Sequence, residues 1–254
     1  MVRYRGRMLP HPPQIDAHTS ALFLDVDGTL LELEEYPEDV RADLKLLDML
    51  SAIAEKLGGA LALVSGRSLK EIDRIFYPKI FAASGEHGAE TRDDRGCILT
   101  IPGTPIDALI TEDVVAFART NELLLENKQH GIALHYRQNP EFEDACRRLM
   151  QSVLAELPEE YRLIDGKMVF EITRRVHNKG DAVKTLLDMA PFHGRSPIYV
   201  GDDVTDEDGF KAANDLAGTS VRIGQSDSTV ARYAIDDVST ARAWLSQTIH
   251  AETH

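Results

Sequence analysis

The 254-residue chain is poor in cysteine and in long apolar runs, and each shortage excludes a class of protein. Its two cysteines, Cys97 and Cys146, lie far apart and outside any CxxC pattern, which argues against a disulfide scaffold and a thiolate metal site. We therefore expect a reducing, cytoplasmic location. No apolar run approaches the roughly 20 residues of a membrane-spanning helix, so we expect no membrane partner.

Basic residues are also scarce, with 28 Lys and Arg against 42 Asp and Glu, which gives a formal net charge of −14. Because nucleic-acid affinity comes largely from Lys and Arg, we expect no nucleic-acid partner. Hydrophobic residues make up 43% of the chain and charged residues 28%, as in ordinary globular proteins. No feature of the sequence indicates an oligomeric state.

Apolar runs alternate with amphipathic segments at both ends of the chain. The predicted strands cover residues 21–28, 60–67, 79–88, 196–203 and 219–224, and the predicted helices cover 37–57, 69–76, 178–190, 206–215 and a final segment through Ile249. This alternation predicts an α/β fold, a doubly wound parallel sheet with helices on both faces. Ligands bind such sheets at the carboxyl ends of the strands.

The middle of the chain has a different pattern, with a helix to about Asn121, a strand at 131–137, a helix at 140–157 and a hairpin around Asp165–Gly166. We expect an inserted α+β cap domain at residues 105–175 and a catalytic core formed by residues 1–104 and 176–254. Residues 1–18, with several arginines and prolines, are expected to be a flexible leader.

Two carboxylates end the first predicted strand, in the stretch from Asp25 to Thr29. A chain that turns there can bring Asp25 and Asp27 to one pocket, where one attacks as a nucleophile and the other acts as an acid. Gly28 permits close approach to a ligand. The alternative is an ordinary turn after a strand, with Asp-Gly as its punctuation.

A second acidic stretch, from Asp202 to Asp208, follows the strand at 196–203. Carboxylates this close repel one another unless a cation lies among them, and oxygen ligands suit Mg²⁺. We assign Asp202 and Asp203 to the metal. Asp206, Glu207 and Asp208 are assigned mainly to a helix start, where Thr205 and Asp208 form a capping-box pattern.

Two further residues stand where a phosphate could bind. Ser65 ends a predicted strand, and Lys179 opens a predicted helix, whose positive end favours anions. Taken singly, they fit a plain Ser-Gly turn and a solvated lysine. The ordered set of Asp25, Asp27, Ser65, Lys179 and Asp202–Asp203, each at a strand end or helix start, favours a catalytic site.

This ordered set resembles the four motifs of the haloacid dehalogenase (HAD) superfamily of phosphotransferases, whose core is Rossmann-like. The chain is similar to one branch in particular, the trehalose-6-phosphate phosphatases. The resemblance covers about residues 22–222 and includes SGR at 65–67, GEHGAE at 85–90, ENKQHGIALHYR at 126–137, Glu171 with the later Lys179–Gly180, and GDDVTDEDGF at 201–210.

The resemblance implies a Mg²⁺-dependent phosphatase that hydrolyses trehalose 6-phosphate through an aspartyl-phosphate on Asp25. Asp27 would act as the acid and base, and Ser65 and Lys179 would hold the phosphoryl oxygens. The implied metal ligands are Asp25, the main-chain carbonyl at Asp27, and Asp202, with Asp203 orienting the metal's water shell or Lys179. The implied sugar-binding residues are Glu126, Lys128 and Glu171, with Gly66, Arg67, Glu86 and His87 near the seam between core and cap.

One departure and two alternatives accompany this interpretation. Where the family usually has a basic residue and then Pro, this chain has Thr173 and Arg174, and Arg174 on a strand would face away from Glu171. A phosphatase for another sugar phosphate, such as sucrose phosphate or mannosyl-phosphoglycerate, would share the core. The second alternative is a non-catalytic module that accepts phosphate or binds a sugar.

Overall fold

A computed structural model describes residues 2–4, 7–33, 39–99, 106–226 and 228–250. The chain divides into two compact units. We call Met1–Thr100 with Asn178–His254 the core unit, and Ile101–His177 the inserted unit. No helix in these ranges is long and apolar enough to cross a bilayer.

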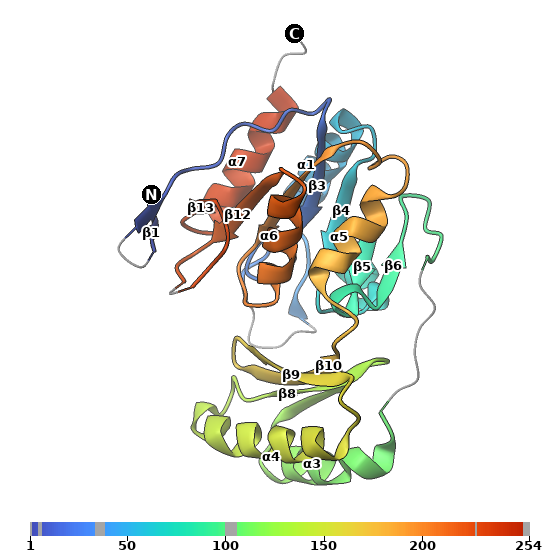
Figure 1. Cartoon of the computed structure of the whole chain (residues 1–254), viewed down its shortest axis with the longest axis vertical. Coiled ribbons are helices and arrows are strands. Elements are labelled where there is room, and N and C mark those ends of the chain that lie inside the picture. The colour runs from blue at the N-terminus through green and yellow to red at the C-terminus, as the bar shows by residue number, and fades with distance from the viewer. Residues whose placement is uncertain (1, 5–6, 34–38, 100–105, 227, 251–254) are drawn as a thin grey trace. The chain divides into compact units, whose positions relative to one another are not determined.

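The core unit is built on a seven-stranded sheet (Figure 1). All neighbouring strands are parallel except β5 and β6. From β3 the chain extends the sheet through β4 and β5, then returns at β11 and extends it the other way, which confirms the predicted doubly wound α/β fold. In spatial order the strands are β13 (Tyr233–Ile235), β12 (Thr219–Ile223), β11 (Ser196–Gly201), β3 (Ser20–Leu24), β4 (Leu61–Val64), β5 (Ala82–Gly85) and β6 (Glu90–Arg92).

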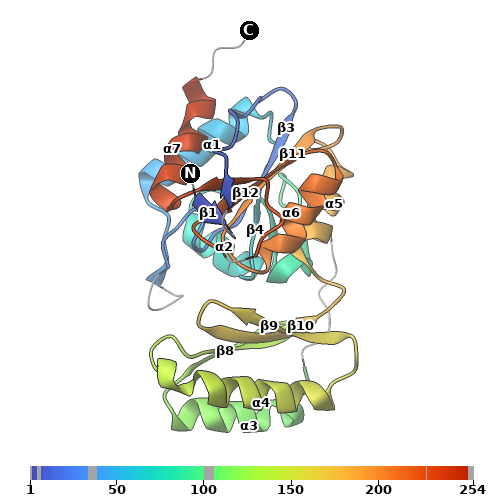
Figure 2. The same ribbon diagram turned by 60° about the vertical axis from the view of Figure 1, so that its left-hand side comes forward.

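Helices cover both faces of this sheet. Helices α1 (Leu44–Lys56) and α7 (Val238–His250) lie together on one face, and α5 (Lys179–Leu187) and α6 (Asp206–Asp215) lie on the other (Figure 2). Because both faces are covered, β3 and β4 are buried along their whole length, as their apolar sequences require. A short helix, α2 (Leu69–Phe76), and a 3₁₀ turn, η2 (Glu86–Gly88), complete the unit.

Helix α1 begins later than the sequence predicted. The sequence predicted Pro37 near the start of this helix. Pro37 lies outside the described residues, and the helix begins at Leu44. The Asp43 side chain accepts a hydrogen bond from Leu46 N at 2.8 Å, which satisfies one of the unpaired N–H groups of the first turn. A local cap therefore sets this boundary.

Residues of the arginine-containing leader, which was predicted to be flexible, contact the core unit. Strands β1 (Val2–Tyr4) and β2 (Arg7–Leu9) pair as an antiparallel hairpin. Farther along, Ile15 is buried in the hydrophobic core, and Trp244 Nε1 donates to Pro13 O at 3.1 Å. The prolines exclude a helix here, but they leave carbonyl groups that other elements bind.

The inserted unit is a four-stranded antiparallel sheet with two helices on one face (Figure 1). Its strands lie in the order β7 (Leu124–Asn127), β8 (Gly131–His135), β10 (Val169–Arg174) and β9 (Tyr161–Gly166). Its helices are α3 (Ala108–Thr120) and α4 (Glu143–Glu156), the latter preceded by the 3₁₀ turn η3 (Pro140–Phe142). Strand β7 was not predicted.

The hairpin between β9 and β10 turns two residues later than predicted. Asp165 and Gly166 belong to β9, Gly166 pairs with Val169, and the turn is formed by Lys167 and Met168, with φ of +62° at Met168. Asp165 is exposed, and its carboxylate pairs with Arg147 of α4. The Asp-Gly pair therefore indicated a hairpin correctly but misplaced its turn.

Candidate active site

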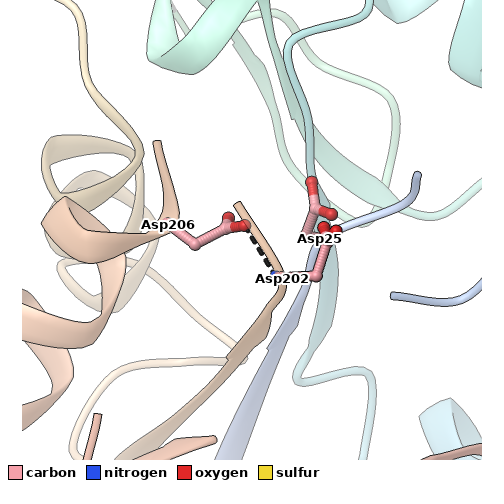
Figure 3. A group of neighbouring side chains, drawn as sticks. All are labelled: Asp25, Asp202 and Asp206. Atoms are coloured by element: carbon pink, nitrogen blue, oxygen red, sulfur yellow. Dashed lines mark hydrogen bonds between the residues drawn. The ribbon is translucent and has the colours of Figure 1, made fainter. Parts of the chain in front are cut away.

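Three carboxylates meet at the carboxyl edge of the core sheet. Asp25 follows β3, Asp202 follows the neighbouring strand β11, and Asp206 is the first residue of α6 (Figure 3). The two strands are in register, and Asp25 N donates to Val200 O at 2.9 Å. One carboxylate oxygen from each of the three residues lies within 4.8 Å of the others. The parallel topology thus brings together acids about 180 residues apart in sequence.

Glycines make room for these carboxylates. A Cβ at Gly28, whose φ is +81°, would lie 2.2 Å from Asp202 Oδ2. A Cβ at Gly201 would lie 2.2 Å from Asp206 Cγ. Any other residue at either position would displace an acid of the group, so the close approach requires glycine both after β3 and at the end of β11.

Lys179 lies between two of the acids. Its Nζ donates to Asp25 Oδ1 at 2.7 Å and to Asp206 Oδ1 at 2.6 Å. The Asn178 side chain caps α5 by accepting from Asp181 N, which fixes Lys179 as the first helical residue. Burial alone would lower the pKa of Lys179, but the charges of Asp206 and Asp25 outweigh it and raise the pKa, so the ammonium stays charged. We call Asp25, Lys179, Asp202 and Asp206 the carboxylate–lysine cluster.

Asp206 begins α6, as the sequence predicted, but its side chain also makes contacts beyond the helix. Its side chain is fully buried, whereas Thr205 makes no side-chain cap. Asp206 Oδ1 accepts from Lys179 and from the Tyr199 hydroxyl, and Oδ2 accepts from the N–H groups of Asp202 and Asp203. The signal was present, because Asp206 shares the buried helix face with Gly209, Phe210 and Ala213 at spacings of three, four and seven.

The carboxylate–lysine cluster carries three acids and one ammonium, an excess of negative charge inside the protein. Burial, together with the charges of Asp206 and Asp202, raises the pKa of Asp25 well above its ordinary value, although Lys179 opposes the shift. Burial would also raise the pKa of Asp206, but Lys179 and the other donors hold it below its ordinary value. A cation beside Asp25 would relieve this repulsion.

The oxygen-only donor set fits a hard divalent cation. A carboxylate has about four acceptor positions, and all four on Asp206 are occupied by hydrogen bonds. A cation would therefore be ligated by Asp25 and Asp202. Asp203, assigned to the metal from the sequence, lies outside the group of three acids, and its N–H binds Asp206 instead.

Asp27 and Arg67 form an ion pair of their own. Arg67 Nε donates to Asp27 Oδ2 at 2.6 Å and Nη2 donates to Oδ1 at 2.7 Å, a bidentate arrangement. The Asp27 side chain is 26% exposed, in contrast to the buried acids of the cluster. The two carboxylates of the first motif thus occupy different surroundings, as a division between nucleophile and acid requires.

Four more of the predicted site residues follow the adjacent strands β4 and β5. Ser65 is buried, its Oγ accepts from Arg67 N at 3.2 Å, and its carbonyl accepts from His87 N at 3.0 Å. Glu86 and His87 are also buried and have positive φ values of 43° and 57°. A Cβ at Gly66 would lie 2.7 Å from the His87 ring, so this glycine allows the two loops to pack together.

The predicted sugar-binding residues of the inserted unit share one face of its sheet. Glu126 and Glu171 both pair with Ala133 in register, so their side chains lie on the face opposite the buried Leu134 and Phe170. The third predicted residue, Lys128, contacts this face, because its Nζ donates to Glu171 Oε2 at 2.6 Å. His135, which was not predicted to bind the sugar, also lies there, with Nε2 3.3 Å from Glu126 Oε2. We call Glu126, Lys128, His135 and Glu171 the inserted-unit polar cluster.

Arg174 lies on the other face of the same sheet. It pairs across the ladder with Tyr161, its guanidinium carbon lies 5.6 Å from the centre of that ring, and its Nη2 lies 3.5 Å from Glu160 Oε1. Within the inserted unit, Arg174 is therefore kept away from Glu171 by strand alternation. Across the ladder from Thr173, β9 places Arg162 on the Glu171 face.

Comparisons with known proteins show which family the chain is similar to. A family model described as trehalose-phosphatase matches residues 23–239. A probable trehalose-phosphate phosphatase of Sinorhizobium fredii is 43% identical over 210 residues, which cover 82% of this chain and 79% of the relative. The trehalose-6-phosphate phosphatase of Escherichia coli is 38% identical over 239 residues, 93% of this chain and 89% of the relative.

Solved structures show the same fold. A trehalose-6-phosphate phosphatase related protein superposes with a TM-score of 0.70 at 26% identity, covering 91% of this chain and 97% of the other. The C-terminal domain of the C. albicans trehalose-6-phosphate phosphatase superposes with a TM-score of 0.78 at 20% identity, covering 95% and 99%, a likeness of fold alone. Residues 23–239 include both clusters described above.

Proposed function

Because this chain belongs to the trehalose-phosphatase family, we propose that it hydrolyses trehalose 6-phosphate to trehalose and inorganic phosphate. The observation that carries the proposal is the buried contact between Asp25 and Lys179 at the carboxyl edge of the core sheet. A carboxylate held there beside a permanent positive charge is suited to attack a phosphate, an anion that would otherwise repel it.

In the first step an Asp25 carboxylate oxygen attacks phosphorus, and the bond between phosphorus and the sugar oxygen breaks. Asp27 donates the proton that the departing oxygen takes up. In the second step water attacks the same phosphorus, Asp27 accepts the water's proton, and Asp25 leaves as a carboxylate. Proton and charge balance over the two steps, so Asp27 ends as it began.

Asp27 must leave Arg67 before it can donate that proton, because both of its oxygens accept from the guanidinium. We therefore include a rearrangement of this pair in the proposal. Arg67, freed from the carboxylate, becomes available to the phosphate or the sugar. Bidentate donation suits Arg for either ligand, since guanidinium geometry matches pairs of oxygens.

Lys179 and Ser65 hold the phosphoryl oxygens in this proposal. Lys179 keeps its charge, since the pKa is raised by Asp206 and Asp25 against the effect of burial. Ser65 ends β4, the strand next to β3, and supplies a hydroxyl. Mg²⁺ bound by Asp25 and Asp202, with Asp203 and the carbonyl of Asp27 as further predicted contacts, would offset repulsion between carboxylate and phosphate.

The inserted unit supplies the sugar contacts. Ionised side chains in pairs, such as Lys128 with Glu171, provide both donors and acceptors for a polyhydroxyl ligand. We keep Glu126, Lys128 and Glu171 as sugar-binding residues, with Gly66, Glu86 and His87 as predicted contacts from the core unit. Free Cys97 and Cys146 support a cytoplasmic location.

The test is phosphate release from trehalose 6-phosphate, sucrose 6-phosphate and glucose 6-phosphate, each assayed with Mg²⁺ and with a chelator. We expect turnover of trehalose 6-phosphate in Mg²⁺, at least about tenfold higher kcat/KM than for the other esters, and loss of turnover in the chelator. A preference for another ester would overturn the substrate assignment. Absence of multiple turnover on all three esters would favour the alternative, a non-catalytic module that accepts phosphate or binds a sugar.

A further inference from the structure

Tyr199 is a buried tyrosine that no step above uses. It lies on β11, three residues before Asp202, and has no exposed surface. Its hydroxyl donates to Asp206 Oδ1 at 2.8 Å. The same oxygen accepts from Lys179 Nζ at 2.6 Å, and Lys179 also donates to Asp25, so three hydrogen bonds connect the hydroxyl to the carboxylate of Asp25.

Packing against α6 fixes the position of the Tyr199 ring. A Cβ at Gly209 of α6 would lie 2.4 Å from Tyr199 Cζ, so the ring tip occupies the space that a side chain there would fill. On the same helix, Phe210 meets the ring edge-on at a centroid distance of 5.7 Å. Glycine is unfavourable in a helix interior, and here it admits a ring that carries its hydroxyl to Asp206.

We propose that Tyr199 is a positioning residue, which acts through Asp206 to hold Lys179 beside Asp25. The inference rests on the proposed phosphatase reaction. Asp206 Oδ1 has two donors, and the tyrosine hydroxyl is the uncharged one. That hydroxyl, together with the two N–H groups that donate to Oδ2, fixes the orientation of the Asp206 carboxylate, so that Lys179 is shared between Asp206 and Asp25.

Removal of the hydroxyl leaves a buried carboxylate oxygen with one donor fewer. The carboxylate then draws Lys179 toward itself and away from the position of the reacting phosphate. Lys179 stabilises charge that grows during phosphoryl transfer, so its displacement lowers the rate of the chemical step more than the binding of substrate. A tyrosine that only filled space would be replaced by phenylalanine without loss, because the ring is unchanged.

The primary experiment is Tyr199→Phe, assayed with trehalose 6-phosphate and Mg²⁺. We expect kcat to fall about tenfold while KM changes by less than about twofold. The matched control is Tyr136→Phe, which removes a hydroxyl from a buried tyrosine of the inserted unit that stacks on Phe170. The control is expected to keep the wild-type kcat. Wild-type kcat in a folded Tyr199→Phe protein would overturn the proposal.

A second variant, Gly209→Ala, keeps every hydrogen-bonding group of the network and displaces only the ring tip. We expect kcat to fall by at least about tenfold in the protein that circular dichroism shows to be folded, since shifts of about 1 Å near reacting groups are costly. A folded Gly209→Ala protein with wild-type kcat would contradict the inference as directly as an active Tyr199→Phe protein would.

A generic ester separates failure of this inference from failure of the proposed function. p-Nitrophenyl phosphate needs the core-unit residues but offers no disaccharide to the inserted unit. If the wild type hydrolyses this ester and not trehalose 6-phosphate, the substrate assignment is wrong, and the Tyr199→Phe effect on kcat is measured with the generic ester. Equal kcat for variant and wild type on that ester would then overturn the role of Tyr199.

Discussion

The core unit and the inserted unit each contain a lysine with a carboxylate 2.6 Å away, but Lys179 is buried and Lys128 is only partly buried. Lys179 has two carboxylate partners, and the side chains of Lys179, Asp25 and Asp206 are 3%, 6% and 0% exposed. Lys128 has Glu171 as its carboxylate partner at that distance, and their side chains are 12% and 8% exposed. The neighbouring Glu126–His135 pair is 26% and 17% exposed.

The difference matches what each unit is proposed to do. Charges that act on a reacting phosphate must be in place before the reaction, because reorganisation would add to its barrier. Side chains that bind a sugar instead exchange their mutual contacts for contacts with hydroxyl groups. A buried lysine shared by two carboxylates resists such exchange, whereas the more exposed pairs Lys128–Glu171 and Glu126–His135 allow it.

The largest effect that tests this difference between the two units is expected for Asp25→Asn. The substitution removes the nucleophile, so phosphate release should fall by more than about 10⁴-fold. It also removes one of three clustered negative charges, and we expect the melting temperature to rise, as is common when a strained catalytic group is neutralised. Phosphate release and thermal unfolding check both effects. A variant with most of the wild-type rate would exclude Asp25 as the nucleophile.

The next effect compares the two lysines directly. Lys179→Met leaves two buried carboxylates without their shared cation, and we expect the free energy of unfolding to fall by about 3–5 kcal/mol. Lys128→Met removes one charged hydrogen bond to Glu171, with an expected loss of about 1.5–3 kcal/mol. Urea denaturation of the two variants measures the difference. Equal losses of unfolding free energy in the two variants would show that the second carboxylate partner of Lys179 adds nothing to stability.

Sequence reasoning recovers the parts of the site that depend on strand ends. Asp25, Ser65 and Asp202 each follow an apolar strand, and parallel strands bring their carboxyl ends to one edge. The doubly wound order follows from the same alternation of strands and helices. These features are local patterns combined with one rule of topology, so they need no knowledge of individual side-chain contacts.

Other features depend on contacts between distant residues. Asp206 fits a helix N-terminus by local rules, and its spacing places it on the buried helix face, but its partners Tyr199 and Lys179 are seen only in the structure. Strand β7 was not predicted because it is a four-residue edge strand whose second half, Glu126 and Asn127, is polar and matched a turn equally well. The turn at Met168 is set by ladder register, which composition does not encode.

A smaller effect is expected for Glu171→Gln. It distinguishes sugar binding by the inserted unit, which sets KM, from the chemical step in the core unit, which sets kcat. Glu171 is proposed to bind the sugar, so its neutralisation should raise KM for trehalose 6-phosphate about tenfold with little change in kcat. For p-nitrophenyl phosphate, which lacks the sugar, both parameters should stay at their wild-type values. Steady-state kinetics on the two esters supplies the measurement. A loss of kcat on both would place Glu171 in the chemistry.

The smallest expected effect is the loss, at low pH, of the stability that the Glu126–His135 pair contributes. Burial would raise the pKa of Glu126, but the hydrogen bond and charge of His135 hold it below its ordinary value of 4.5. A folded pKa below the unfolded one means that the charged carboxylate stabilises the fold above pH 4.5, and that this contribution is lost as pH falls through the folded pKa. Glu126→Gln should therefore lower the free energy of unfolding at neutral pH by less than about 1 kcal/mol.

That difference should vanish in acid, and urea denaturation of wild type and variant between about pH 7 and about pH 3 measures it. Glu112→Gln, at an exposed position on α3, is the matched control and should give the same difference from wild type at every pH. A Glu126→Gln effect that persists unchanged in acid would mean that the carboxylate contributes through its shape rather than its charge. The inserted-unit pairs would then be fixed like the core cluster, and the contrast between exchangeable and permanent charges would be wrong.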